Sequence, residues 1–179
     1  MHILLDPLPE VIGGSGMSGA RRVLVLGIGN PDRGDDGVGA FVVHRLRDRL
    51  APGCEVRTCA GDIVGIVDDC AGFEAWVCVD CAAPAAAPGH VHRIDLAVQE
   101  LPRELLLPAS SHTLGITTAI ELARALGNAP ADIVFYAVEG CRFDLGAGLS
   151  PAVAAAATRL VEQVAQEVQG LRQRSADPR

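Results

Sequence analysis

The sequence predicts a three-layer α/β/α domain with a mostly parallel, twisted sheet of about five strands and one antiparallel edge strand. Short runs of aliphatic and β-branched residues alternate with segments whose apolar residues keep helical spacing. Continuous apolar strands are typical of parallel sheets that helices cover on both faces. One predicted strand instead alternates polar and apolar residues, as an edge strand does. The predicted strands lie near residues 22–27, 54–59, 75–80, 90–95 and 132–138, and the fourth is the edge strand.

A glycine-rich turn follows the first predicted strand, with five glycines between Gly27 and Gly39. Glycine allows positive φ angles and close approach of the backbone to another group. Asp35 and Asp36 lie where the next helix should begin, and carboxylates there cap free amides and suit the helix dipole. The helical pattern then continues to Leu50.

A strand, a glycine-rich turn and a helix raise the alternative of a nucleotide-binding module. The dinucleotide fingerprint requires glycine at the third position after Gly29, and that position is Asp32. No Gly-Lys-Ser/Thr sequence follows, so a P-loop is absent. The carboxylates make the turn acidic, which disfavours phosphate and favours a cation.

Further candidate site residues follow later in the chain. Asp80 ends the strand at 75–80, where it either caps a nearby loop or acts as a ligand at the carboxyl edge of the sheet. His90 and His92 lie on one face of the edge strand and could bind a metal, although solvated side chains are the favoured interpretation. His112 lies near the start of a helix that Gly127 ends, a place where a lone histidine is usually structural.

The last predicted helix begins at Ser150, the expected N-cap, with Pro151 in its first turn. Its apolar residues form one stripe at helical spacing, which should cover a face of the sheet. The stripe comprises Val153, Ala157, Leu160, Val164, Val168 and Leu171.

Composition narrows the function classes. The 179 residues carry a net charge of −7, and the basic residues are scattered arginines, which disfavours nucleic acid and anionic membranes as partners. No apolar run reaches the roughly 18 residues of a membrane span. Without a secretory signal, the six cysteines are predicted to be reduced thiols in the cytoplasm. Cys78 and Cys81 form a C-x-x-C pair, for which zinc or redox chemistry is the less favoured interpretation.

The predicted domain organisation is simple. Residues 1–20 form a loose leader, and Met17 suggests that translation starts later than Met1. Residues 21–172 form a single α/β domain, and residues 173–179 form a frayed polar tail.

The line GIGNPDRGDDGVG resembles the opening motif of the nickel–iron hydrogenase maturation endopeptidases, which have Gly-Ile/Val-Gly-Asn, a short loop and Asp-Asp/Glu-x-x-Gly after a hydrophobic strand. The resemblance extends over nearly all of residues 22–170. Its later parts are a hydrophobic strand ending in Asp80, a Ser-x-His motif at Ser110–Gly115, and a Gly-x-x-Leu-Ser/Thr motif at Gly146–Val153. Cys81 replaces an alanine of the family pattern, and the Asp-Gly-Gly-Thr motif is only loosely matched at 59–62.

The resemblance implies a phosphorylase/hydrolase-like fold and a cytoplasmic, monomeric endopeptidase. Such a protein removes a short C-terminal peptide from the precursor of a hydrogenase large subunit once nickel is in place. It carries no tightly bound cofactor of its own and recognises the precursor's nickel through three side chains, which correspond to Asp36, Asp80 and His112. These are also the predicted catalytic residues of an aspartic-type or metal-dependent mechanism. Asp35 then supports the site or caps the helix.

The predicted fold allows these three side chains to meet at one end of the sheet. Two carboxylates and an imidazole form a donor set suited to nickel, zinc or manganese. A cysteine or serine protease is disfavoured, because no cysteine has a protease signature around it and G-x-S-x-G is absent. Two alternatives stay open: a nickel-binding assembly chaperone or sensor without proteolysis, and the nucleotide-binding module.

Overall fold

The computed structural model describes residues 20–59, 70, 72–84, 87–102 and 111–174, and for residues 111–117 it describes the backbone alone. The elements in chain order are β1 (Val23–Ile28), the 3-10 turn η1 (Gly34–Gly37), α1 (Val38–Leu46), β2 (Cys54–Cys59), β3 (Ala75–Ala82), β4 (Val91–Asp95), α3 (Ser111–Ala125), β5 (Asp132–Glu139) and α4 (Pro151–Gln173). Nearly all of the expected leader at 1–20, with its start at Met17, and most of the tail lie outside the described residues.

The strands form one five-stranded sheet in the order β2-β1-β3-β5-β4. β1 pairs in parallel with β2 and β3, and β3 pairs in parallel with β5. β4 is the antiparallel edge strand beside β5. The predicted fold class is therefore confirmed. Because four strands run in the same direction, their carboxyl ends lie at one edge of the sheet.

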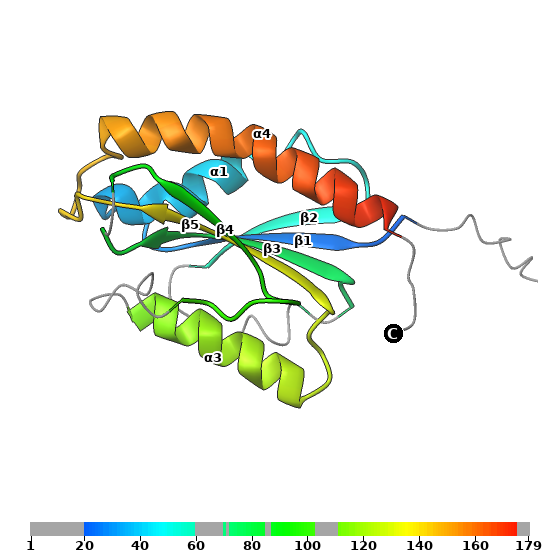
Figure 1. Ribbon diagram of the computed structural model, residues 1–179. Coiled ribbons are helices and arrows are strands. Elements are labelled where there is room, and N and C mark those ends of the chain that lie inside the picture. The colour runs from blue at the N-terminus through cyan, green and yellow to red at the C-terminus, as the bar shows by residue number, and fades with distance from the viewer. Residues whose placement is uncertain (1–19, 60–69, 71, 85–86, 103–110, 175–179) are drawn as a thin grey trace, which may run out of the picture.

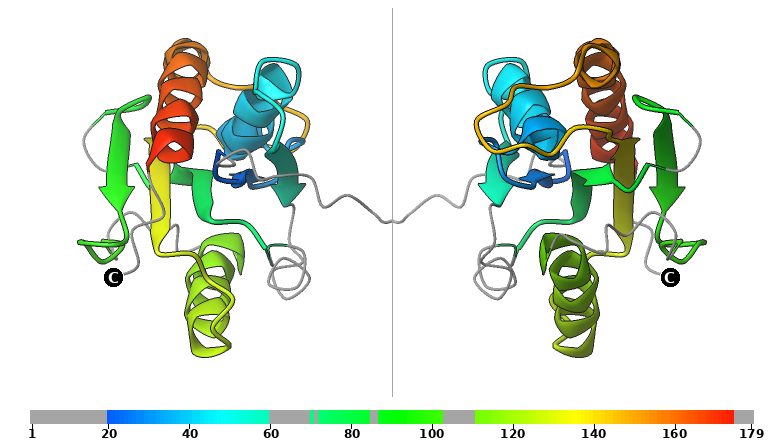
Figure 2. Two further views of the ribbon diagram at one scale, coloured as in Figure 1. Left: turned by 90° about the vertical axis from the view of Figure 1, so that its right-hand side faces the viewer. Right: turned by 90° about the vertical axis from the view of Figure 1, so that its left-hand side faces the viewer.

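Helices cover both faces of the sheet. Figures 1 and 2 show α1 and α4 on one face and α3 on the other. Alternate residues of β3 divide between the two resulting cores, with Val77 and Val79 facing α1 and α4, and Trp76 and Cys78 facing α3. The predicted stripe of α4 is confirmed, since all six of its residues are buried in the first core.

One helix end differs from the predictions, and another is confirmed. α1 ends at Leu46, and Leu50 packs against the core from the loop that follows. α3 ends at Ala125, two residues before Gly127, which was predicted to end it. Gly127 has a φ of 72°, the left-handed conformation that commonly ends helices.

The glycines of the turn allow direct backbone contact between α1 and the sheet. A Cβ atom added at Gly39 would lie 2.5 Å from the backbone nitrogen of Ile28 and 2.5 Å from the carbonyl oxygen of Val79. Any side chain at this position would push α1 away from β1 and β3. Close packing therefore explains a glycine that could also have indicated a nucleotide loop.

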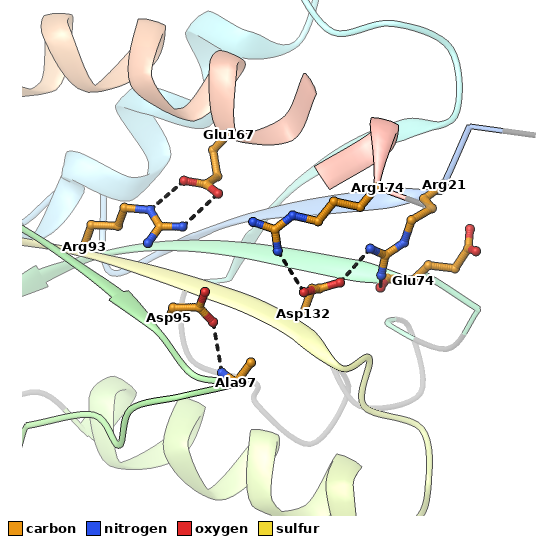
Figure 3. Close-up of polar contacts among 8 residues, drawn as sticks. All are labelled: Arg21, Glu74, Arg93, Asp95, Ala97, Asp132, Glu167 and Arg174. Carbon is orange, nitrogen blue, oxygen red and sulfur yellow. Dashed lines mark hydrogen bonds and ion pairs between the residues drawn. The ribbon is translucent and has the colours of Figure 1, made fainter. Parts of the chain in front are cut away.

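Arginines and carboxylates join the elements at the amino end and along the middle of the sheet, as Figure 3 shows. Asp132, at the start of β5, accepts hydrogen bonds from Arg21 at 2.6 Å and from Arg174 at 3.0 Å. Arg93 donates two hydrogen bonds, of 2.6 and 2.9 Å, to Glu167 of α4. These contacts hold the residues before β1 and the C-terminal half of α4 against the sheet.

No helix among the described residues is long and apolar enough to cross a membrane.

Candidate active site

The acidic turn lies directly after β1, at the carboxyl edge of the sheet. The chain forms the single 3-10 turn η1 before α1 begins at Val38, and neither helix has a side-chain hydrogen bond at its N-cap. Asp35 is 0% exposed and Asp36 is 1% exposed. Both carboxylates are therefore withdrawn from water, which requires compensating contacts.

Asp36 has one carboxylate oxygen without a partner. Its Oδ2 atom accepts a hydrogen bond of 3.0 Å from the amide of Asn30, whereas Oδ1 has no hydrogen-bond partner among the described residues. Gly29, with a φ of 110°, makes room for this arrangement, because a Cβ atom there would overlap the carbonyl oxygen of Asp36. Leaving a buried polar atom unpaired costs about 1–3 kcal/mol, and more for a charged group. Such an atom is a candidate ligand for a bound cation.

Asp80 lies near the end of β3 and is 2% exposed. Its Oδ1 atom accepts a hydrogen bond of 2.7 Å from the amide of Cys81. Because Cys78 and Ala82 belong to the core beneath α3, the alternation of the strand places Asp80 on the same side. Burial, and then the carboxylates of Asp80 and Asp36, raise the pKa of the Cys81 thiol. The negative charges of both predicted aspartates therefore act on the Cys81 thiol.

His112 is the second residue of α3. Figure 1 shows that α3 begins at the edge of the sheet where the parallel strands end, the same edge as the acidic turn. The side chain of His112 lies outside the described part of the structure, so its contact with the two aspartates stays a prediction.

Asp35 does not cap α1, which corrects one of the two roles expected for it. Its Oδ2 atom accepts hydrogen bonds of 2.9 Å from the amides of Cys141 and Arg142, and its Oδ1 atom accepts one of 2.6 Å from the amide of Ser150. Burial alone would raise the pKa of the Asp35 carboxyl, but these three amides hold the pKa below its ordinary value. Asp35 therefore fastens the loop between β5 and α4 to the acidic turn.

Ser150 is the N-cap of α4 and Pro151 follows it, as predicted, but the Ser150 hydroxyl makes no capping hydrogen bond. The backbone amide of Ser150 is used by Asp35 instead. A carboxylate from a distant turn thus helps to fix the point at which α4 begins.

The geometry disfavours the nucleotide-binding alternative. The amides of the turn, which would have to bind phosphate, already donate to oxygens within the protein. Gly34 donates to the carbonyl of Ala147 at 3.0 Å, and Asp35 donates to the carbonyl of Arg142 at 2.7 Å.

The cysteines do not form the zinc or redox pair that C-x-x-C suggests. Cys78 faces the core beneath α3, whereas Cys81 faces the core beneath α1 and α4, so the two thiols lie on opposite sides of the sheet. All six cysteines are free thiols. Burial raises the pKa of both Cys78 and Cys81, which keeps these thiols protonated and unsuited to nucleophilic attack.

A groove of about 510 Å³ opens beside the acidic turn. Gly34 and Gly37 of the turn form part of its wall, and Phe41 and Leu149 give it an apolar surface. A peptide lying in this groove would contact the residues that flank Asp35 and Asp36.

One contact near this edge had not been predicted. Glu139, for which no role was predicted, is 0% exposed, and its Oε1 atom lies 2.8 Å from Nε2 of His92. The prediction that both histidines of the edge strand are solvated is confirmed for His90 and wrong for His92, which is partly buried. The sequence did contain a signal for this contact. One strand ends in a carboxylate, and the edge strand carries two histidines two residues apart.

Comparison with known protein families decides the classification. The family model HycI, described as hydrogenase maturation protease, matches residues 58–167. The chain belongs to the hydrogenase maturation protease family. The resemblance seen in its motifs is therefore confirmed.

Individual relatives agree with this assignment. The chain is 29% identical over 145 residues to the hydrogenase expression/formation protein HupD of Thiocapsa roseopersicina, covering 79% of this chain but only 65% of HupD. It is 27% identical over 146 residues to the hydrogenase 2 maturation protease of Escherichia coli, covering 80% and 88% of the two chains. The structure of the NiFe hydrogenase maturation protease HybD of Thermococcus kodakarensis matches with a TM-score of 0.66 and 27% identity, over 82% of this chain and 99% of HybD.

Proposed function

We propose that the protein is an endopeptidase that removes a short C-terminal peptide from the nickel-loaded precursor of a nickel–iron hydrogenase large subunit. Asp36, Asp80 and His112 contact the nickel of the precursor, which is part of the substrate. The observation that carries this proposal is the buried Asp36 carboxylate, which has one oxygen without a hydrogen-bond partner among the described residues.

The cost of burying this carboxylate supports a role in binding. Two further carboxylates, of Asp35 and Asp80, are buried in the same region. Burying like charges near one another is unfavourable in the isolated protein. A divalent cation brought in by the precursor would satisfy the unpaired oxygen and offset the repulsion.

The donor set also suits a site that examines a metal without removing it. Two carboxylate oxygens and one imidazole nitrogen bind nickel less tightly than thiolates do. Three protein ligands leave coordination positions open for water or for groups of the precursor. The precursor therefore keeps its nickel while its chain is cut.

The chemistry of cleavage then depends on the substrate's own metal. A bound divalent cation can polarise the scissile carbonyl, and it can lower the pKa of a bound water. In this proposal Asp36, Asp80 and His112 fix the position of the metal, and the apolar groove beside Gly34 holds the peptide that leads to the scissile bond. Asp35 positions Asp36 through the loop that it fastens at Cys141 and Arg142.

The test is cleavage of purified large-subunit precursor, prepared with and without nickel and followed by intact-mass spectrometry. The wild-type protein should shorten the nickel-loaded precursor and leave the nickel-free precursor intact. Asp36→Asn and His112→Ala should each reduce the cleavage rate by about 100-fold or more, because each removes a ligand of the recognised metal. Asp32→Asn is the matched control, since Asp32 lies in the same loop but is exposed.

Normal cleavage by both Asp36→Asn and His112→Ala would overturn the proposed roles. If the wild-type protein binds the nickel-loaded precursor but leaves its mass unchanged, the protein is an assembly chaperone and the proposed activity is wrong. Circular dichroism of each variant separates a lost ligand from a lost fold.

A further inference from the structure

Two histidines and a glutamate gather at the β4–β5 strand pair. The amide of Glu139 donates to the carbonyl of His90 at 2.9 Å, which places these residues opposite each other across the antiparallel pair. His92 lies two residues further along the edge strand, so its side chain projects from the same face as that of His90. We call His90, His92 and Glu139 the edge cluster.

The edge cluster lies on the side of the sheet that α3 covers. Ile94 and Ala137, two residues away from His92 and Glu139, both belong to the core beneath α3. Asp80 projects from the same side of β3, and Ala82 pairs with Glu139 in the parallel register of β3 and β5. The edge cluster is therefore adjacent to the candidate active site but shares no residue with it.

The donor atoms of the edge cluster lie close to the separations that a metal site requires. One ligand atom from each residue lies within 4.8 Å of the others, and Nε2 of His92 is 2.8 Å from Oε1 of Glu139. Zinc binds nitrogen and oxygen ligands at about 2.0–2.2 Å, which places two ligands of one ion about 3–3.5 Å apart. His90 is exposed, so its ring can rotate to close the remaining gap without disturbing the core.

The backbone around Glu139 holds its carboxylate in place. Its Oε2 atom accepts a hydrogen bond of 3.0 Å from the amide of Ala87, which leaves Oε1 directed at His92. The carbonyl of Glu139 accepts a hydrogen bond of 2.7 Å from the amide of Gly89. Hydrogen bonds of this kind orient ligands and raise metal affinity in known sites.

The ring arrangement favours a chelate over a simple ion pair. A bond to His92 would by itself compensate the buried carboxylate and would place no demand on the orientation of the His90 ring, which lies on the same face through strand alternation. The rings of His90 and His92 instead lie with their centroids 4.6 Å apart and their planes at 78°. One nitrogen from each ring can therefore bind the same ion, while the exposed side of His90 leaves a path from solvent.

We infer that His90, His92 and Glu139 form a second site, which binds a divalent transition metal such as Zn²⁺ or Ni²⁺, with water in the remaining positions. Two imidazoles and one carboxylate are a common donor set for these ions. The site is independent of the proposed recognition of nickel in the precursor. It also departs from the expectation that the protease carries no metal of its own.

The experiment is a titration of chelator-treated, full-length protein with Co²⁺, followed by visible absorption, and with Zn²⁺, followed by calorimetry. The titration is carried out in the Asp36→Asn background, so that the candidate active site contributes little. We expect one equivalent of metal to bind, and His90→Ala and Glu139→Gln each to weaken binding by at least about 100-fold. His44→Ala is the matched control, because His44 is an exposed histidine of α1 outside the edge cluster.

The inference is wrong if His90→Ala binds metal as the parent protein does, or if the Asp36→Asn background binds none. His90→Ala is the decisive variant, since this side chain is exposed and its removal should leave the melting temperature unchanged. Cleavage of the precursor does not enter this readout, so the second site and the proposed activity can fail separately.

Discussion

Two regions of the sheet satisfy their carboxylates in different ways. Asp132 at the amino end and Glu167 beside the middle of β4 are half-buried and paired with guanidinium groups, and these pairs join separate elements. At the carboxyl end, the buried Asp35 is held by three backbone amides, and the buried Asp36 keeps one oxygen without a described partner. Arginines therefore neutralise the first two carboxylates, whereas Asp35 and Asp36 have no arginine partner among the described residues.

This difference separates stabilising contacts from a prepared binding site. An arginine beside a carboxylate satisfies the charge permanently and leaves nothing to recognise a cation. Backbone amides satisfy the hydrogen-bonding capacity of a carboxylate while keeping its negative charge. We therefore expect substitutions of the arginine-paired carboxylates to change stability, and substitution of Asp36, which keeps one oxygen without a described partner, to change function.

The largest effect on stability is expected for Asp35→Asn. The variant loses the charge that three amides stabilise, and its NH₂ group must face at least one of these amide donors. We expect the free energy of unfolding to fall by about 3 kcal/mol. Urea unfolding followed by circular dichroism measures this change, with Asp32→Asn as the exposed control. A loss of less than about 1 kcal/mol would show that the loop at Cys141 is held by other contacts.

The contribution of Asp35 should also depend on pH. Its pKa in the folded protein lies below the ordinary value of 3.8, so the unfolded state binds the proton more tightly. The stabilisation is therefore fully present above pH 3.8 and is lost as the pH falls through the lower folded pKa. The difference in unfolding free energy between wild type and Asp35→Asn should narrow in that acid range. A difference that stays constant there would contradict the assignment.

A smaller effect is expected for Glu167→Gln. The variant loses the charge of the two-bond contact with Arg93, whose side chain is 41% exposed, and solvent screening reduces the value of such a pair. We expect a loss of about 1 kcal/mol and an unchanged rate of precursor cleavage. Glu162→Gln, which breaks the more exposed pair with Arg49, should cost less than about 0.5 kcal/mol. Reduced cleavage by a folded Glu167→Gln variant would contradict the distinction between stabilising ion pairs and the candidate active site.

A small change of opposite sign is expected for Asp36→Asn. The amide oxygen of asparagine can still accept the hydrogen bond from Asn30, and the variant removes a buried negative charge near Asp80. We expect the free energy of unfolding to rise by about 0.5 kcal/mol while cleavage is lost. A stability loss of more than about 1 kcal/mol would show that Asp36 serves the fold rather than a ligand.

Much of the fold could be predicted because local patterns report burial directly. The apolar runs of β1 and β3 and the stripe of α4 follow the periods of strands and helices, and all three elements are where they were expected. Helix ends were less predictable. Leu50 keeps the spacing of α1, but the helix ends at Leu46.

The candidate site could be predicted only in part. Motif resemblance named Asp36 and Asp80, and the structure places both at one edge of the sheet. The role of Asp35 could not be predicted, because its three amide partners come from a loop more than 100 positions away in sequence. The proximity of His90 and Glu139 likewise depends on the pairing of β4 with β5.

The sequence by itself determined the layered architecture and the acidic, glycine-rich turn, because side-chain burial and backbone conformational preferences act over a few neighbouring residues. Only the tertiary structure decided which carboxylates are neutralised, which keep an unpaired oxygen and which meet a histidine. Electrostatic and hydrogen-bonding partners are set by distance in space, and folding brings together groups whose separation along the chain gives no indication of contact.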